Sequence, residues 1–107
     1  MDLKERHCVV ISEGTEPLKN EQIKQFREEL LPGWQVIDNK LIKKEFPFEN
    51  FKMGMAFAQE IAMIAEKENH HPDICIHYTN VEVELSTHSI GGLSENDFII
   101  AAKIDDL

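Results

Sequence analysis

Four of the five histidines in this chain lie between residues 66 and 97, namely His70, His71, His77 and His88. Histidine has the side chain whose unperturbed pKa lies closest to neutral pH, so it both donates and accepts protons in that range. His70 and His71 close a long helical pattern and are followed by Pro72, whereas His88 comes at the end of an alternating strand pattern. These residue types favour a site that moves protons on a small molecule. Their chemistry alone does not name that molecule.

Each of these histidines also has a structural interpretation. The helix dipole favours histidine near a helix C-terminus, so His70 and His71 could simply form a polar helix end. His88 could be a hydrogen-bonded structural residue. Glu66 is of a type that helices usually expose to water. We assign no chemical role to His77.

Asp97 has a capping interpretation beside a chemical one. The segment Ser94-Glu95-Asn96-Asp97 resembles a capping box in which Asp replaces the usual Glu or Gln. Acidic residues are also favoured in the first turn of a helix. On the residues alone, capping is the preferred role for Asp97.

A metal site and a serine hydrolase are the chemical alternatives. Three histidines can hold a catalytic zinc with one position open, but neighbours such as His70 and His71 normally direct their side chains apart. Neither an H-E-x-x-H helix nor a cysteine pair accompanies them. Ser86 and Ser89 lie in no nucleophile motif, and Gly91-Gly92 is too short for a phosphate-binding loop. We therefore prefer direct acid–base chemistry by histidine.

The composition describes one globular domain. A chain of 107 residues is long enough for a modest core but short for two. A formal net charge of −9 argues against a nucleic-acid surface, and no apolar run approaches the roughly 20 residues of a membrane span. The charged N-terminus lacks the apolar region of a signal peptide. We expect a cytoplasmic protein with one domain over residues 1–107, an N-terminal arm over residues 1–17, and free thiols at Cys8 and Cys75.

The hydrophobic periodicity predicts the order of the elements. It indicates a strand or extended arm over 7–11, a helix over 20–31 and strands over 34–37 and 41–46. A long helix then starts at Glu49 or Asn50 and runs to about Lys67, followed by strands over 74–78 and 81–85 and a helix from 94 onward. Pro32-Gly33 ends the first helix, and Asp38-Asn39 forms a hairpin turn. The order helix, hairpin, long helix, hairpin, helix is typical of an α+β fold with helices on one face of an antiparallel sheet.

The helix over residues 50–67 is apolar around most of its circumference. One stripe holds Phe51, Met55, Ala58, Ala62 and Ala65, which Phe57, Ile61 and Ile64 widen, and Met53 and Met63 lie on the other side. A helix needs only about a 100° apolar stripe to pack on a sheet. We therefore expect burial on two sides, by the sheet and by a second subunit. The alternative is that the methionines fill gaps in a single core.

The compound spacing Glu66-x-x-x-His70-His71-Pro72, then Tyr78, His88 and Asp97, resembles the pterin-4a-carbinolamine dehydratase family. Further similarities are Gly33-Trp34, the phenylalanines at 46, 48 and 51, Ser86-Thr87-His88, and Gly92 to Asp97. The resemblance covers about residues 30–107, and Pro17-Leu18 is also similar to many bacterial members. Two positions depart from the family pattern. Ile11 stands where many relatives have a second cysteine, and Asn69 stands where some have Asp.

This resemblance implies an α+β fold with a four-stranded antiparallel sheet, assembled as a homodimer or homotetramer. It implies dehydration of 4a-hydroxytetrahydrobiopterin to the quinonoid dihydropterin without a metal or coenzyme, which recycles the cofactor of aromatic amino-acid hydroxylases. The implied catalytic residues are His70, His71 and His88, with His70 and His88 on the 4a-hydroxyl side, and the implied substrate-binding or supporting residues are Glu66, Ser86, Thr87 and Asp97. Two non-catalytic alternatives stay open, a dimerisation cofactor for a transcription factor and a pterin-binding protein of molybdenum-cofactor metabolism.

Overall fold

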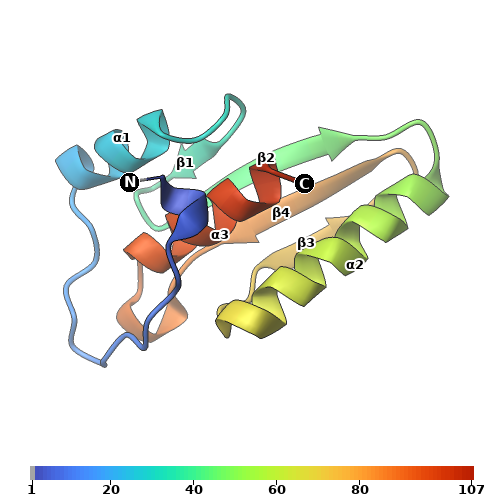
Figure 1. Cartoon of the computed structure of the whole chain (residues 1–107). Coiled ribbons are helices and arrows are strands. Elements are labelled where there is room, and N and C mark those ends of the chain that lie inside the picture. Colours follow the sequence, from blue (N-terminus) through green and yellow to red (C-terminus); the bar gives the residue numbers. More distant parts are fainter. Residues whose placement is uncertain (1) are drawn as a thin grey trace.

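The computed structural model describes residues 2–107 and places three helices against a four-stranded antiparallel sheet (Figure 1). The elements in chain order, with η for short 3-10 helices, are η1 (Leu3–Glu5), α1 (Asn20–Glu28), β1 (Gln35–Ile37), β2 (Leu41–Pro47), α2 (Phe51–Glu68), β3 (Asp73–Ile76), β4 (Asn80–Leu85), η2 (His88–Ile90) and α3 (Glu95–Asp105). The predicted fold class and the predicted order of helices and hairpins are confirmed.

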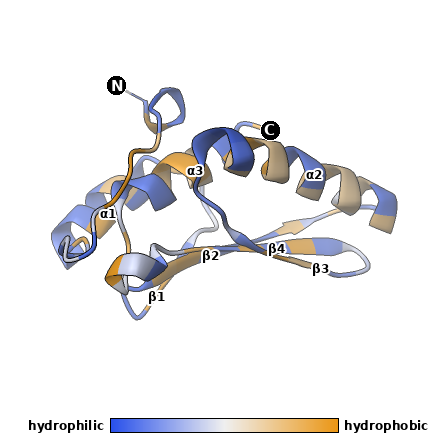
Figure 2. Ribbon diagram, turned by 90° about the horizontal axis from the view of Figure 1, so that it is seen from below, coloured by the Kyte–Doolittle hydropathy of each residue, from blue (hydrophilic) through white to orange (hydrophobic). Residues whose placement is uncertain are grey.

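The two hairpins combine into a sheet with the strand order β1-β2-β4-β3. The register between the central strands sets Ile42 opposite Leu85 and Phe46 opposite Val81. Directly opposed residues project from the same face of a sheet, so these apolar side chains share one face while Glu84 projects from the other. Figure 2 shows α1, α2 and α3 together on one side of the sheet. The opposite side is not covered by any element of residues 2–107.

The core lies between the apolar sheet face and the helices. From α3 it receives Phe98, Ile100 and Ile104, and from α2 it receives Ile61, all of them essentially inaccessible to water. Burying a side chain of this size stabilises the fold by about 1.5–3 kcal/mol. The core therefore fixes α2 and α3 relative to β4, and the ends of these three elements carry the candidate site.

The caps of α2 match its sequence. Asn50 accepts a hydrogen bond from the Met53 backbone N–H at 2.9 Å, as expected of an N-cap. At the other end Asn69 has a φ of 55°, a left-handed conformation that Asn tolerates better than most residues. The predicted start at Asn50 is confirmed, and the helix ends one residue later than predicted. The left-handed turn redirects the chain immediately before His70.

Residues 7–11 form no strand and run as an extended arm over α2 and α3. Leu3, which lies in η1 before this arm, is 2% exposed. After the arm, the chain is held where the Leu18 N–H donates to the Leu93 carbonyl at 2.8 Å. A Cβ on Gly92 would lie 2.7 Å from the Pro17 side chain, so only glycine fits at position 92.

Two element boundaries differ from the sequence prediction by more than one residue. The first helix ends at Glu28, because the Leu31 N–H leaves the helix and donates to the Asp105 carboxylate at 3.1 Å. The third strand ends at Ile76, because His77 N–H donates to the Asn80 carbonyl at 2.8 Å and closes a turn. That turn leaves Tyr78 78% exposed rather than within the strand.

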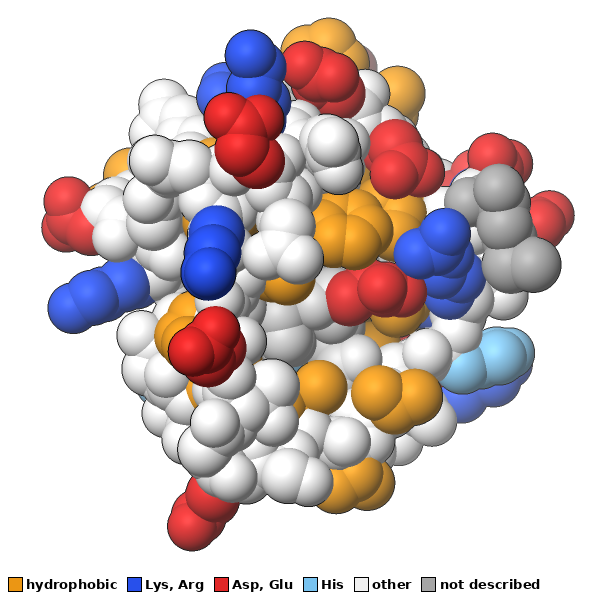
Figure 3. Space-filling model, turned by 90° about the vertical axis from the view of Figure 1, so that its left-hand side faces the viewer, with side chains coloured by type: hydrophobic (Ala, Val, Ile, Leu, Met, Phe, Trp, Pro, Cys, Tyr) orange, Lys and Arg blue, Asp and Glu red, His pale blue; other side chains and the backbone are white. Residues whose placement is uncertain are grey.

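The outward side of α2 keeps apolar residues exposed, among them Phe51, Met53, Met55 and Met63. Burial of this side by a second subunit stays a prediction. On a different face of the molecule, shown in Figure 3, acidic and basic side chains surround a group of apolar ones. Within residues 2–107, no helix has the length and apolar character needed to cross a membrane.

Candidate active site

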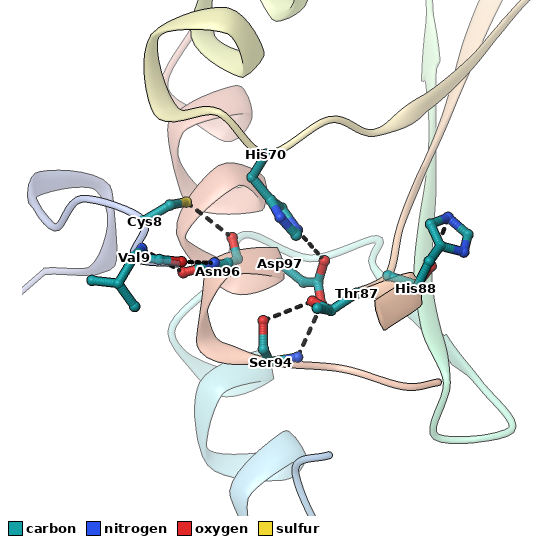
Figure 4. Close-up of polar contacts among 9 residues, drawn as sticks. Cys8, Val9, His70, Thr87, His88, Ser94, Asn96 and Asp97 are labelled. Atoms are coloured by element: carbon teal, nitrogen blue, oxygen red, sulfur yellow. Dashed lines mark hydrogen bonds and ion pairs between the residues drawn. The ribbon is translucent and has the colours of Figure 1, made fainter. Parts of the chain in front are cut away.

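His70 is positioned by the end of α2. After the left-handed Asn69, the His70 N–H still donates to the Ala65 carbonyl at 3.2 Å, which ties the residue to the last helical turn. The ring points toward the first turn of α3, where its Nε2 lies 2.7 Å from Oδ1 of Asp97 (Figure 4). The His70 side chain is 13% exposed and that of Asp97 is completely buried.

Asp97 is both a helix cap and the partner of His70. Its Oδ2 accepts the Ser94 N–H at 3.0 Å, which completes the capping box predicted from the sequence. The same oxygen accepts the Thr87 hydroxyl at 2.8 Å. Thr87 in turn lies 2.7 Å from the Ser94 hydroxyl. Three donors thus converge on one buried carboxylate, which satisfies its acceptors and holds it rigidly.

This arrangement selects a tautomer of His70. A carboxylate only accepts hydrogen bonds, so the Nε2 atom that faces Asp97 is the one that carries a proton. In the neutral ring Nδ1 is then the acceptor. Among residues 2–107 the His70 ring makes its side-chain hydrogen bond through Nε2 alone. Nδ1 is therefore the nitrogen available to a bound molecule.

His71 is paired with Glu66 in a much wetter environment. Its Nε2 lies 2.5 Å from Oε2 of Glu66, and the two side chains are 54% and 78% exposed. Water and salt screen a pair of this kind, so its contribution to stability is small. The contact nevertheless directs the His71 ring back along α2.

His88 opens η2 and is exposed. Its nearest side-chain partner is the Ser86 hydroxyl, with Oγ and Nε2 3.5 Å apart. In Figure 4 the His88 ring points away from Asp97, whereas the neighbouring Thr87 points toward it. The family resemblance assigns both Ser86 and Thr87 to support, but Ser86 contacts His88, whereas Thr87 contacts Asp97, the partner of His70.

The candidate residues accordingly form three groups. The structure brings His70 together with Asp97 and Thr87, His71 with Glu66, and His88 with Ser86. Within residues 2–107, no hydrogen bond joins one of these histidines to another, and no cluster of three or more His, Cys, Asp or Glu side chains is placed to hold a metal ion.

A cavity of about 270 Å³ lies beside His70. One wall is the N-terminal arm from Cys8 to Ile11, and Thr87 and Ser89 contribute hydroxyl-bearing residues from the β4–η2 region. His71 and His88 are not among the lining residues. The volume is near the lower end of small-ligand sites.

Glu68 is a residue of this region that the sequence analysis missed. Its side chain is 4% exposed, and it accepts the Cys8 N–H at 2.8 Å and His7 Nδ1–H at 2.9 Å. Burial alone would raise the pKa of Glu68, but these two hydrogen bonds and the charge of Lys103 outweigh burial and lower the pKa below its ordinary value. A sequence signal existed, because an acidic residue in the last turn of a helix opposes the helix dipole and needs partners.

Asn96 was missed as well. It is 4% exposed and exchanges two hydrogen bonds with the backbone of Val9, donating to the carbonyl at 2.7 Å and accepting the N–H at 3.1 Å. The capping box drew attention to Ser94 and Asp97 and gave no reason to single out Asn96. Its partner is 87 positions away, a separation that local patterns do not report.

The sequence model of the family described as pterin 4 alpha carbinolamine dehydratase matches residues 16–107. The chain belongs to this family. The resemblance found in the His70-His71-Pro72 motif is thereby confirmed. The match begins after the segment that forms the cavity wall, so residues 8–11 lie outside it.

Relatives align with this chain over nearly their whole length. A protein from Nitrosospira multiformis is 47% identical, over 99% of this chain and 92% of its own. One from Rubrobacter xylanophilus is 41% identical, over 99% of this chain and 98% of its own. Both are named "putative pterin-4-alpha-carbinolamine dehydratase".

Solved structures agree on the architecture. The structure of a "transcriptional coactivator/pterin dehydratase" from Brucella melitensis has a TM-score of 0.79 at 33% identity, over 85% of this chain and 97% of that chain. A pterin dehydratase-like protein identified as a RuBisCO assembly factor in the alpha-carboxysome has a TM-score of 0.59 at 24% identity, over 69% of this chain and 87% of that one. The second likeness shows a shared fold.

Proposed function

We propose that this protein dehydrates 4a-hydroxytetrahydrobiopterin to the quinonoid dihydropterin, with histidines as acid and base. The observation that carries the proposal is the buried Asp97 carboxylate, which holds His70 in a defined tautomer beside a cavity. Family membership supplies the substrate class. The reaction would recycle the tetrahydropterin cofactor of aromatic amino-acid hydroxylases.

The chemistry requires two proton movements. The C4a–O bond breaks as its hydroxyl takes up a proton and leaves as water, while N5 loses its proton and the C4a=N5 double bond forms. A neutral imidazole can accept the N5 proton, and an imidazolium can supply the proton to the departing hydroxyl. Positioned proton transfer of this kind contributes roughly 10² to 10⁴-fold to the rate.

We assign His70 and His88 as the acid and base candidates near the 4a-hydroxyl, and His71 as the residue that orients the pterin, although only His70 lines the cavity. His70 offers Nδ1 to the cavity side because Nε2 is engaged by Asp97. The His88 ring is exposed and has a 3.5 Å contact with the Ser86 hydroxyl, so it is accessible to a bound molecule. Glu66 supports His71 through their 2.5 Å contact.

The test is to generate the 4a-hydroxypterin in solution and follow its ultraviolet decay with and without protein. Wild-type protein should accelerate the decay, and the double variant His70→Ala/His71→Ala should lose most of the acceleration, by roughly 10²-fold or more. His77→Ala is the matched control, because His77 is exposed and has no proposed role. Wild-type protein without any acceleration would overturn the enzyme proposal.

A non-catalytic role is the second candidate. The Brucella melitensis structure is named as a coactivator as well as a dehydratase, which favours a dimerisation-cofactor role as the alternative. A pterin-binding role in molybdenum-cofactor metabolism is a further alternative, on the family resemblance alone. Binding of biopterin by wild-type protein without faster decay of the 4a-hydroxypterin would support this candidate.

We further propose a cytoplasmic homodimer or homotetramer. The exposed apolar side of α2 supports assembly, since Met63 is 67% and Phe51 48% exposed in a single subunit. The free thiols of Cys8 and Cys75 support a reducing compartment.

A further inference from the structure

We infer that the arm segment 8–11 is part of the pterin site and covers the substituent on C6 of the pterin. The inference rests on the proposed function and adds a specificity-determining wall to it. Residues 8–11 line the same cavity as His70. They lie outside residues 16–107, which match the family model, so the family motif does not assign them a role.

The arm is fastened to the two elements that hold His70. The Cys8 N–H donates to Glu68, which lies two positions before His70 in the chain. The Val9 backbone is held by Asn96, the immediate neighbour of Asp97 in the first turn of α3. Figure 4 shows Cys8 and Val9 on one side of Asn96 and His70 on the other. The position of the arm is therefore fixed relative to the imidazole by short, partly buried hydrogen bonds.

The two sides of the cavity differ in chemistry. His70 and the hydroxyl-bearing residues Thr87 and Ser89 line one side. The arm presents Val9 and Val10, whose side chains are 66% and 92% exposed. Exposed valines gain stability when a ligand removes them from water. Figure 3 faces the side along which the chain passes from the arm to α1, and apolar side chains are visible there among charged ones.

The connectivity of the pterin ring relates these two sides. N5 is bonded both to C4a, where the hydroxyl departs, and to C6, which bears the substituent. A pterin whose N5 or C4a lies beside His70 therefore has its C6 substituent a few bonds away. The adjoining wall of the cavity is the arm, so the arm is the surface that distinguishes pterins by this substituent.

The test compares the binding of two stable fluorescent probes, biopterin, which has a dihydroxypropyl group on C6, and pterin, which has hydrogen there. Val10→Asp changes a nearly fully exposed side chain and so leaves folding unaffected. Asn96→Ala removes the clamp on Val9. The control is Ile37→Asp, the same kind of change on β1, where Ile37 is 37% exposed and does not line the cavity.

We expect Val10→Asp and Asn96→Ala to raise the dissociation constant of biopterin by about threefold to tenfold, the effect of one or two lost contacts. Pterin itself should bind all variants within about twofold of wild type, and Ile37→Asp should bind both probes normally. Arm variants that bind biopterin as tightly as wild type would overturn the role of the arm and leave the proposed dehydration intact. Wild-type protein that binds neither probe would overturn both.

Discussion

The histidines of the motif differ most in how far each one is removed from water. His70 faces a carboxylate with no exposed surface, whereas His71 faces a Glu66 side chain that is 78% exposed. An electrostatic interaction is stronger where water is excluded. Asp97 therefore controls its histidine far more firmly than Glu66 does, and the buried pair is the better place to test the chemistry.

Replacing Asp97 by Asn should separate its two roles. The amide oxygen can still accept the Ser94 N–H and cap α3, so we expect the free energy of unfolding to fall by only about 1–2 kcal/mol. The amide cannot hold His70 as a carboxylate does, so dehydration should slow by about 10-fold to 100-fold. Thermal unfolding and the ultraviolet assay measure the two effects.

Glu95→Gln is the control for this substitution, because Glu95 lies in the same helical turn and contacts Arg6 rather than a candidate histidine. It should retain normal activity. An Asp97→Asn protein with full activity and a normal pH profile would show that Asp97 serves as a cap only.

The two thiols should react at very different rates. Burial, reinforced by the nearby Glu68 carboxylate, raises the pKa of Cys8 to about 12. Only the thiolate is nucleophilic, and at pH 8 Cys8 is almost entirely protonated. Cys75 is exposed on β3. Iodoacetamide at pH 8 should therefore alkylate Cys75 first, as peptide mass spectrometry can establish, and Cys75→Ser protein should stay unmodified until it is denatured. Early labelling of Cys8 would mean that the arm is released in solution.

At the scale of elements, α2 and α3 were the most predictable parts of the fold. Asn50 and the Ser94-to-Asp97 box are local signals, and each marks a helix start in the structure. The two hairpins followed from the alternation of their strands and, for the first hairpin, from the Asp38-Asn39 turn, where both residues have positive φ. Local chemistry decides these features, so the sequence suffices to predict them.

The contacts that complete the site were less predictable. Glu68 and Asn96 act through residues 7–9, which are more than 50 positions away in the chain. The sequence left open whether residues 7–11 form a strand or an arm. Only the packed tertiary structure brings this segment to the end of α2. The histidines themselves were found from the motif, but their separate environments depend on the packing.

The stability of the contact between residues 7–8 and α2 depends on pH through Glu68. Its pKa is lower in the folded chain than the ordinary value of 4.5. At a pH between the folded and the ordinary pKa, the unfolded chain therefore binds more protons at Glu68 than the folded chain does. The stabilisation by Glu68 is thus present above its ordinary pKa and is lost as the pH falls through its pKa in the folded chain. We expect Glu68→Gln to lower the free energy of unfolding by about 1–3 kcal/mol at pH 7. This difference from wild type should shrink below about pH 4.

Urea unfolding followed by circular dichroism across this pH range measures the effect, with Glu60→Gln as the control on an exposed part of the same helix. A difference between wild type and Glu68→Gln that does not change with pH would contradict the assignment. In that case, the arm would be held by its backbone and by Leu3 rather than by the carboxylate.

At the scale of the whole molecule, one side of a long helix is left apolar in a strongly charged protein. The net charge of −9 opposes non-specific association of the chains. Yet Met53, Met55 and Met63 of α2 are 46%, 37% and 67% exposed. Exposed apolar groups of this kind often mark an interaction site. The sheet already buries the inner side of α2, so a second copy of the chain is the partner that the proposed assembly requires.

Met63→Lys should therefore dissociate the oligomer. In a two-fold symmetric interface each substitution appears twice, so two lysines would be buried near each other at considerable cost. We expect light scattering to give a mass of two or four times 12.3 kDa for wild type and 12.3 kDa for the variant.

Leu31→Lys is the control, because Leu31 is 57% exposed but lies outside α2. Since Met63 projects outward, the variant should remain a folded monomer that unfolds cooperatively, with a lower thermal midpoint than the oligomer. A wild-type mass of 12.3 kDa at high protein concentration would contradict the assembly, and the methionines would then be surface residues of a monomer.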